Sequence, residues 1–502
     1  MEAFLQPLQG LAEFEEIKKR CGANCGILNV SGCMESQKVH LMYGLSGLFP
    51  YHLILADDER NAKEIYEDYR FYDKNVYFYP AKDLLFFQAD IHGNLLIRQR
   101  MRVIRALLEQ EEVTVVTSID GCMDFLMPLE KIRSRLLHFK SDSVIDLDQL
   151  KEELVELGYE RTGQVELPGQ FSVRGGIIDI YPLTEDNPWR IELWDDEVDS
   201  IRSFDAESQR SLENVDEITI YPAVEKMDGE DMVSFLDYFP EEKTLVFLDE
   251  LNHLAENGEG VEEEYRQSRM HREEKGEANL PEQWLCGFQE LQKKLNRRNC
   301  VAVSALSPRR SGWKINEEFD LTVKSVDSYN SSFELLVKDL LQYKSQGYRI
   351  ALLSGSRTRA ERLAKDLSEE GLNAFYSQDM DRIISPGEIM VVYGHARRGF
   401  QYPLIKFAVM TETDIFGKEQ KKRKKKKKYS GNRIQDFAEL SIGDLVVHEK
   451  HGLGIYRGIE KVEVDRVVKD YIKIEYRGGS NLYILATQLD ALQKYSGSSE
   501  NA

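Results

Sequence analysis

The stretch FSVRGGIIDIYPLTEDNPWRIELWDDEVDSIRSFD, residues 171–205, carries the clearest folding signal of the chain. Residues 177–181 form a mostly apolar run that is typical of a buried strand, and residues 189–194 alternate apolar and polar side chains as a second strand does. Pro182 and the turn-rich residues 184–188 separate the two runs. The pattern therefore predicts a β-hairpin.

Three residues of this hairpin are candidates for binding another protein. Arg190 and Trp194 lie four positions apart on the second strand, so they point to the same face, and Arg174 precedes the glycine pair that enters the first strand. Two arginines and a tryptophan have the composition of a protein-binding hot spot. Alternatively, Trp194 belongs to the core and the arginines pair with the acidic residues nearby, Asp195, Asp196 and Glu197.

Composition limits the class of protein. At 502 residues the chain is too long for one core, and three or four folded units are expected. No apolar run is long enough to span a bilayer, so no membrane partner is expected. The formal net charge of −21 disfavours a surface built for nucleic acid and favours protein partners. The six cysteines do not complete a zinc set, which predicts no metal site and reduced thiols in a cytoplasmic protein.

The N-terminal part alternates helices and strands, beginning with an amphipathic helix expected at residues 4–20, and this order predicts a parallel sheet covered by helices. A strand, a loop and a helix follow at residues 26–39, where Gly32 and Lys38 have the spacing of a phosphate-binding loop. Gln37 replaces the second glycine of that motif, and Val39 replaces the hydroxyl that binds magnesium. We therefore expect a degenerate nucleotide loop that does not bind ATP.

Residues 245–250, Leu-Val-Phe-Leu-Asp-Glu, resemble the strand that holds magnesium in nucleotide-binding proteins. Without a working phosphate loop, an ordinary strand end is the better interpretation. Residues 328–417 then predict a small α/β domain with no catalytic signature. Residues 418–435 contain eight consecutive cations, Lys421 to Lys428, and are interpreted as an extended basic linker.

Short strands bent by glycines follow in residues 436–497 and predict a small SH3-like β-barrel. His448 and His451 are not a zinc motif, because the segment predicts strand and turn rather than a helix that would place two histidines on one face. The whole chain is therefore expected to be a multidomain α/β protein with a C-terminal barrel.

The hairpin region also has a long and specific pattern, carried by Arg174-Gly175, Ile178-Asp179, Tyr181-Pro182, residues 190–197, Phe204-Asp205 and Ser208-Gln209-Arg210. It resembles the region shared by the excision-repair protein UvrB and the bacterial transcription-repair coupling factors, known as Mfd. The resemblance implies a degenerate RecA-like (P-loop) parallel sheet with an inserted α+β hairpin domain. Its implied parts are a UvrB-like domain 1a at residues 1–140, a UvrA-binding domain 2 at 141–206 and a domain 1b at 207–320. Arg174, Arg190 and Trp194 occupy the family's UvrA-binding positions.

A second resemblance lies in the C-terminal segment, in VVHEKHGLGIYRG at residues 446–458 and the later Leu-Tyr strand. It is similar to the RNA-polymerase-interacting domain of the coupling factors and to CarD-like proteins. The resemblance implies that a strand edge pairs with the polymerase β subunit. The candidate edge is residues 458–464, with Ile459, Val462 and Val464 as the contact residues. Leu485 stands where many relatives have proline.

The order of these parts resembles that of the coupling factors, and the resemblance implies an adaptor that recruits UvrA to RNA polymerase stalled at DNA lesions. No intact nucleotide motif occurs in the chain, so we expect the front portion of a longer protein rather than an enzyme. By resemblance, ATP, magnesium and most DNA contacts belong to the translocase domains that the sequence lacks. The alternative is an ATP-dependent helicase or excision-repair enzyme related to UvrB, and Gln37 with Val39 discriminates against it.

Overall fold

The computed structural model describes residues 1–22, 25–82, 93–224, 232–274, 285–308, 312–417, 431–433, 443–448, 452–464, 467–475, 481–485 and 492–495. The chain divides into two compact units. The first comprises residues 1–262 and 281–418, and the second comprises residues 263–280 and 419–502. Of the basic linker, only residues 431–433 are described, so the lysine run lies outside the described residues. None of the described helices is long and apolar enough to cross a membrane.

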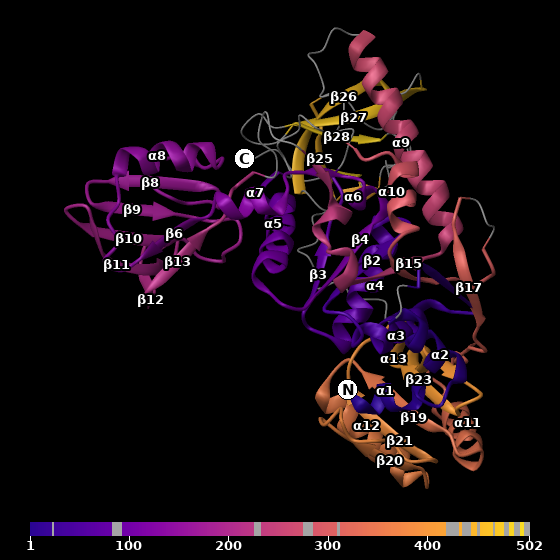
Figure 1. Cartoon of the computed structure of the whole chain (residues 1–502). Helices are drawn as coiled ribbons and strands as arrows, with labels where there is room; N and C mark the ends of the chain where they lie inside the picture. Colours follow the sequence, from indigo (N-terminus) through magenta and orange to yellow (C-terminus); the bar gives the residue numbers. More distant parts are fainter. Residues whose placement is uncertain are drawn as a thin grey trace. The chain divides into compact units, whose positions relative to one another are not determined.

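A seven-stranded parallel sheet forms the centre of the first unit (Figure 1). Its strand order is β17-β1-β16-β15-β2-β4-β3, with bounds Ile315–Asp320, Ile27–Ser31, Asn299–Val303, Thr244–Asp249, Tyr51–Ala56, Val113–Ser118 and Val76–Tyr79. Nearly every residue of the central strands is buried, as expected for a sheet covered on both faces. The prediction of a large parallel sheet is confirmed.

Helices cover both faces of this sheet. One face packs against α5 (Gly93–Glu109) and α10 (Phe288–Leu295), and the other against α1 (Glu2–Leu8), α2 (Ala12–Cys21), α3 (Glu35–Ser46) and α4 (Glu59–Tyr72). The single helix predicted at residues 4–20 is wrong. Helix α1 ends at Leu8 in a turn whose amides at residues 9, 10 and 11 each donate to the carbonyl three residues earlier, and a β-carbon at Gly10 would lie 3.1 Å from Ile405.

Short elements complete this region: α6 (Ile119–Cys122), α7 (Leu129–Ser134), the 3-10 helices η1 (Phe235–Tyr238) and η2 (Glu241–Lys243), and the strand pair β5 (Phe125–Leu126) and β14 (Val233–Ser234). The long helix α9 (Leu251–Glu274) begins in the first unit, and its residues from 263 onward belong to the second.

A second sheet is inserted in the chain between β4 and β15, and it contains the predicted hairpin. Its order is β12-β11-β10-β9-β8-β7, with bounds Ser211–Val215, Glu197–Phe204, Trp189–Trp194, Ile177–Ile180, Gln170–Arg174 and Glu160–Arg161. Strands β9 and β10 pair antiparallel, with Ile178 opposite Ile191, which confirms the hairpin. Apolar residues of one face join a core with α8 (Leu147–Glu156), and the pair β6 (Leu137–Lys140) and β13 (Glu217–Ile220) lies beside it.

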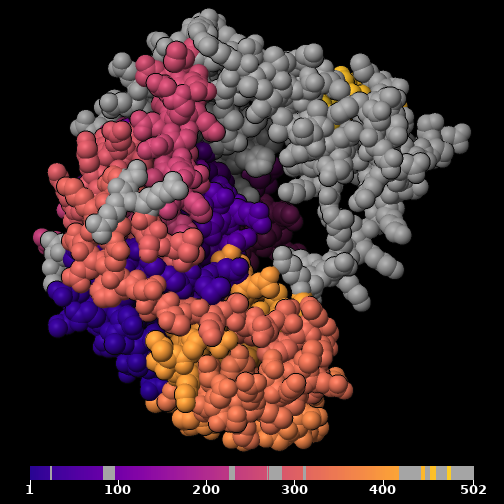
Figure 2. Space-filling model, turned by 90° about the vertical axis from the view of Figure 1, so that its right-hand side faces the viewer, coloured from indigo at the N-terminus to yellow at the C-terminus, as the bar shows by residue number. Residues whose placement is uncertain are grey.

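The small α/β domain contains a third sheet, ordered β18-β22-β23-β19-β21-β20, with bounds Lys324–Ser325, Phe400–Tyr402, Phe407–Thr411, Arg349–Ser354, Glu388–Tyr393 and Asn373–Tyr376. Helices α11 (Phe333–Ser345) and α12 (Arg357–Glu369) share a core with one face, and α13 (Glu412–Phe416) follows β23. The other face joins the core beneath α1, α3 and α4. Figure 2 shows this domain in orange against the indigo N-terminal segment, where Ala3 N–H donates to the Met380 carbonyl over 2.9 Å.

The second unit contains a six-stranded antiparallel sheet. Its order is β24-β29-β25-β26-β27-β28, with bounds Gly431–Arg433, Leu492–Tyr495, Leu445–His448, Gly452–Val464, Val467–Glu475 and Asn481–Leu485. Val446, Tyr456, Ile472 and Ile474 are buried within it. Its closure into an SH3-like barrel stays a prediction.

Candidate functional site

One face of the hairpin sheet is polar and charged, while the other is its core. Alternation along β9 and β10 buries Ile178, Ile180 and Ile191 on the core side and places Asp179, Arg190 and Glu192 on the opposite side. The register brings Arg190 of β10 opposite Asp179 of β9 and Arg202 of β11. This polar face contains all three hairpin residues that the sequence selected.

Asp179 forms ion pairs with both candidate arginines, Arg174 and Arg190. Its carboxylate accepts hydrogen bonds from Arg190 Nε at 2.7 Å and Nη2 at 2.9 Å, and from Arg174 Nη2 at 2.6 Å. The Asp179 side chain is only 1% exposed, so the two guanidinium groups neutralise a buried charge. Arg190 also donates to Gln209 Oε1 at 3.0 Å and covers the Phe204 ring at 4.3 Å. Sequence reasoning missed Asp179 as a partner, although an acid within the apolar run 177–181 is a signal for one.

The two arginines differ in accessibility. The Arg190 side chain is 13% exposed and is held by Asp179, Gln209 and Phe204, whereas the Arg174 side chain is 45% exposed. Arg190 therefore positions the face, and Arg174 keeps much of its guanidinium open to solvent.

Trp194 ends β10, next to a two-residue turn in which Asp195 has a φ of 60°. Its exposed fraction is 81%. The alternative in which Trp194 is a core residue is therefore wrong, and the arginines find their partner in Asp179 rather than in the turn. At about 3.3 Å per strand residue, Trp194 lies about 13 Å from Arg190 along the strand. An exposed indole of this size on a folded sheet is typical of an interaction surface.

A second ion pair completes the charged row. Arg202 Nη1 donates to Glu192 Oε2 at 2.8 Å, and Ser200 Oγ donates to the same oxygen at 3.2 Å. The Arg202 hydrogen bond lowers the pKa of Glu192 below its ordinary value, so this carboxylate stays charged near neutrality. The face thus combines a fixed charged row with one exposed aromatic ring.

The degenerate nucleotide loop is filled by the protein itself. The amides of Gly32 and Cys33 donate to the carbonyls of Ala305 and Ser304, and the amide of Met34 donates to Gln37 Oε1 at 3.0 Å. In a phosphate-binding loop such amides point at the ligand. Gly32 has a φ of 77°, and a β-carbon there would lie 2.1 Å from the Leu321 carbonyl oxygen. The backbone conformation and this close contact therefore explain why the position is glycine, without a bound phosphate.

Lys38, the residue that would reach a phosphate, is paired with acids. Its Nζ donates to Asp249 Oδ1 at 2.7 Å and to Glu250 Oε1 at 2.6 Å. Burial acts to lower the pKa of Lys38, but the two acids outweigh it and raise the pKa above its ordinary value. The strand-end acids predicted at residues 249–250 are therefore counter-ions of this lysine.

The remaining loop positions are buried beneath the small α/β domain. Val39 is fully buried, and Gln37 Nε2 donates to the hydroxyl of Tyr402 on β22 at 2.9 Å. The Tyr402 hydroxyl also lies 3.1 Å from His40 Nδ1. A side chain of the small α/β domain thus contacts Gln37, the residue that stands in place of the second glycine of the motif.

The candidate polymerase edge is part of β26. Residues 452–455 of this strand pair with β25, and residues 455–464 pair with β27. Ile459 lies opposite Ile472, Val462 opposite Lys469 and Val464 opposite Val467. Among the strands that the structure describes, residues 458–464 therefore have one neighbour, and their other edge is available for pairing.

Comparison with known proteins adds family information to this geometry. The family model of the UvrB interaction domain matches residues 137–225, and that of the CarD-like/TRCF RID domain matches residues 440–496. The transcription-repair-coupling factor of Bacillus subtilis (strain 168) is 30% identical, covering 93% of this chain and 46% of that protein. The factor of Staphylococcus aureus (strain MRSA252) is 27% identical, covering 85% of this chain and 41% of its own length. The chain thus spans less than half of the curated relatives it matches.

Proposed function

Because the chain is homologous over nearly its whole length to the transcription-repair-coupling factors, we propose that it is the adaptor portion of such a factor. In this role it recruits UvrA to an RNA polymerase stalled at a DNA lesion. The hairpin sheet holds UvrA, and strand β26 holds the polymerase β subunit. The whole protein would then be an ATP-dependent DNA translocase, with the motor outside this chain.

Trp194 is the observation that supports the UvrA site best. It presents a large apolar surface to solvent at the end of a rigid strand, which is what an interface anchor requires. Arg174 supplies a half-exposed guanidinium for a charge-assisted contact with an acid on UvrA. Arg190 fixes the face by holding Asp179 rather than by offering its own charge to the partner.

Titration of the chain with purified UvrA tests this site. Trp194→Ala should weaken binding by about 2 kcal/mol, and Arg174→Ala by about 1 kcal/mol, the ordinary range for interface anchors. The matched control is Val155→Ala, which removes an exposed apolar side chain from α8 of the same domain. If Trp194→Ala and Val155→Ala bind UvrA equally well, the proposed site is wrong. If the folded wild-type chain does not bind UvrA, the recruiting function itself fails.

The polymerase contact rests on the available edge of β26. Strand pairing supplies main-chain hydrogen bonds, and apolar side chains along the edge give specificity. We expect Val462→Ala to weaken binding to the polymerase β subunit by about 1 kcal/mol. Leu453→Ala is the matched control, because Leu453 is a half-exposed residue in the part of β26 that β25 already pairs. Equal loss in the two variants would contradict the assignment of the edge.

The rival function, a UvrB-like ATP-dependent helicase or excision enzyme, requires nucleotide binding at the loop. The hydrogen bonds that the amides of Gly32 and Cys33 donate to the carbonyls after β16, and the Lys38 ion pairs, argue against it. Equilibrium dialysis with ATP and magnesium tests the point. We expect no saturable binding by the wild-type chain, and binding that Lys38→Ala abolishes would favour the rival.

A further inference from the structure

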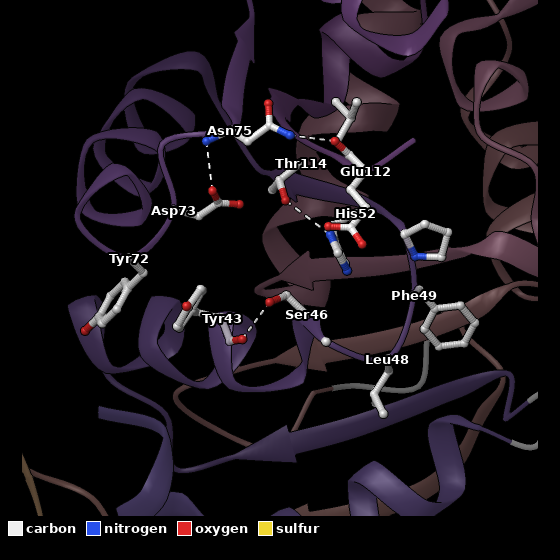
Figure 3. Close-up of a pocket in the computed structure, with 13 residues that line it drawn as sticks. Tyr43, Ser46, Leu48, Phe49, His52, Tyr72, Asp73, Asn75, Glu112 and Thr114 are labelled. Carbon is white, nitrogen blue, oxygen red and sulfur yellow. Dashed lines mark hydrogen bonds between the residues drawn. The ribbon is translucent and has the colours of Figure 1, made fainter. Parts of the chain in front are cut away.

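The proposed function makes no use of two features at the edge of the parallel sheet where its strands begin. One is a pocket of about 470 Å³ beside β2 and β4 (Figure 3). Polar groups of its lining bind one another: the backbone amide of Asn75 donates to Asp73 Oδ1 at 2.8 Å, and His52 Nδ1 lies 3.1 Å from Thr114 Oγ1. The other feature is a pair of thiols just before β1, and these groups offer a chemical reaction.

Cys21 and Cys25 lie on either side of the connection between α2 and β1. Cys21 is the last residue of α2 and is fully buried, whereas Cys25 is half-buried and stands two residues before the strand. The Cys25 amide donates to Asn299 Oδ1 at 3.0 Å, and its carbonyl accepts from Asn316 Nδ2 at 2.6 Å. The two asparagines belong to β16 and β17, so the backbone of Cys25 is fixed against the sheet.

The side chains of the two cysteines are hydrogen-bonded to each other. In its thiol form Cys25 also donates to the Gly26 carbonyl at 3.4 Å. A disulfide requires an S–S distance of about 2.0 Å. Because the two sulfur atoms are already in contact and the cysteines are close in the sequence, the bond can form without movement of distant parts of the chain.

Hydrogen bonding divides the pair into a nucleophile and a proton donor. The hydrogen bond from Cys21 lowers the pKa of Cys25, with help from the backbone amides of Cys25 and Cys300, although burial opposes the shift. The same hydrogen bond, together with burial, raises the pKa of Cys21. The thiolate is the reactive form of cysteine, so Cys25 reacts first and Cys21 follows.

The other four cysteines differ from this pair. Each is fully buried, and burial raises the pKa of its thiol; they are Cys33, Cys122, Cys286 and Cys300. Of these, Cys300 interacts electrostatically with both thiols of the pair, but its S–H donates to the Leu295 carbonyl at 3.3 Å. Exposure and acidity therefore both favour Cys25 as the thiol that an oxidant attacks.

We propose that Cys21 and Cys25 are a redox modification site, which hydrogen peroxide converts to a disulfide. The Cys25 sulfur attacks one peroxide oxygen, the O–O bond breaks, and the departing hydroxide takes the Cys25 proton to become water. The Cys21 sulfur then attacks the sulfenic acid on Cys25, the S–S bond forms, the S–O bond breaks, and a second water leaves with the Cys21 proton.

The balance of this reaction is complete. The two sulfur atoms together lose two electrons, and one peroxide is reduced to two waters. The new bond joins the end of α2 covalently to the residue that leads into β1, and a dithiol reductant reverses it.

Peroxide treatment of the whole folded chain, followed by alkylation under denaturing conditions and peptide mass spectrometry, tests the proposal. We expect four of the six cysteines to be alkylated after oxidation, and all six after reduction with dithiothreitol. Trypsin releases residues 21–38 as one peptide, which contains the pair and Cys33. After oxidation this peptide should carry a single alkyl group, on Cys33, and should lack the two thiol hydrogens of the pair.

Three variants assign the roles of the two thiols. Cys21→Ser should stop the reaction at the sulfenic acid of Cys25, which dimedone traps, and Cys25→Ser should give neither the adduct nor the disulfide. Cys300→Ala is the matched control, because it removes the neighbouring buried thiol and should leave the disulfide unchanged.

The proposal is overturned if all six cysteines of the peroxide-treated wild-type chain are alkylated, or if the disulfide joins Cys25 to Cys300. A dimedone adduct on Cys21 in Cys25→Ser, as abundant as that on Cys25 in Cys21→Ser, would overturn the assigned order of the steps. The alkylation result is obtained on the wild-type chain, so the test does not depend on a variant that disturbs the fold.

Discussion

At the scale of single residues, the hairpin sheet depends on one buried carboxylate. Asp179 is shared by Arg174 and Arg190, and these pairs join β8, β9 and β10 across the polar face. Removing one partner of a buried pair leaves an uncompensated charge, which costs more than the pair contributes. The face that presents Trp194 is therefore held in shape by an internal ion pair.

Arg190→Ala should lower the free energy of unfolding of the hairpin domain by about 3 kcal/mol, because Asp179 loses two hydrogen bonds while buried. Arg174→Ala should cost less than about 1 kcal/mol, because this guanidinium is half exposed. Urea denaturation of both variants measures the difference. Equal losses in the two variants would show that Asp179 is not held mainly by Arg190. If Arg190→Ala weakens UvrA binding, the measured stability of that variant must show whether the hairpin domain is still folded under the binding conditions.

His40 and His52 predict acid sensitivity of the first unit. Burial lowers the pKa of each ring to about 4, against about 6.5 in the unfolded chain. The unfolded state then binds more protons between these values, so the contribution of these two rings to stability is complete above about pH 6.5 and is lost as the pH drops toward 4. Each histidine accounts for a loss of about 3 kcal/mol over that window.

Urea denaturation between pH 7 and pH 4.5 measures this loss. His40→Asn should remove about half of the pH dependence while lowering stability at pH 7, because His40 bridges the Tyr402 hydroxyl and the Phe4 carbonyl. An unchanged pH dependence in this variant would contradict the assignment to His40.

At the scale of elements, the loop before β22 adds a polar contact between the small α/β domain and helices α3 and α4, beside their shared apolar core. The Arg397 amide donates to Asp68 Oδ1 at 3.0 Å, and its Nε donates to Asp68 Oδ2 at 3.2 Å. Asp68 is fully buried and also accepts from Ser36 Oγ at 2.7 Å. Burial raises the pKa of Asp68 although Arg397 opposes the shift. This contact lies directly beside the degenerate nucleotide loop.

Arg397→Ala should destabilise this junction by about 3 kcal/mol, since Asp68 stays buried without its cation. Arg398→Ala is the matched control and should cost less than about 1 kcal/mol, because its side chain is half exposed and 3.8 Å from Glu35. Hydrogen exchange of β22 and of the N-terminal turn of α3 should increase in Arg397→Ala only. Unchanged exchange there would show that apolar packing alone holds the junction.

Local patterns predicted most elements of this chain, and long-range contacts account for the failures. The hairpin and the order from α11 to β23 follow from strand alternation and helix caps. Gly10 packs against Ile405, nearly 400 residues away, and no local pattern reveals that contact. Local patterns also do not reveal the hydrogen bond between Gln37 and Tyr402 or the ion pair between Lys38 and Asp249, because the partners lie far apart in the sequence. For Asp179, the only local signal was an acidic residue within an apolar strand, which indicates a buried carboxylate that needs a cationic partner.

At the scale of the whole molecule, the two proposed partner sites lie in different compact units. The face proposed to bind UvrA belongs to the first unit and β26 to the second, and the sequence places the predicted basic linker of residues 418–435 between them. An adaptor needs both sites at once, and separation into two units allows each partner to be bound without rearrangement of the other site.

We therefore expect the two contacts to be separable by substitution. With immobilised RNA polymerase, the wild-type chain should retain UvrA, because each partner occupies its own unit. Trp194→Ala should keep its polymerase affinity and retain less UvrA, while Val462→Ala should keep its UvrA affinity in solution and leave less of both the chain and UvrA on the resin. The Val155→Ala control should behave as the wild type. Loss of polymerase binding in folded Trp194→Ala, or competition between UvrA and polymerase for the wild-type chain, would contradict the adaptor arrangement, since either result requires the two surfaces to overlap or to be coupled.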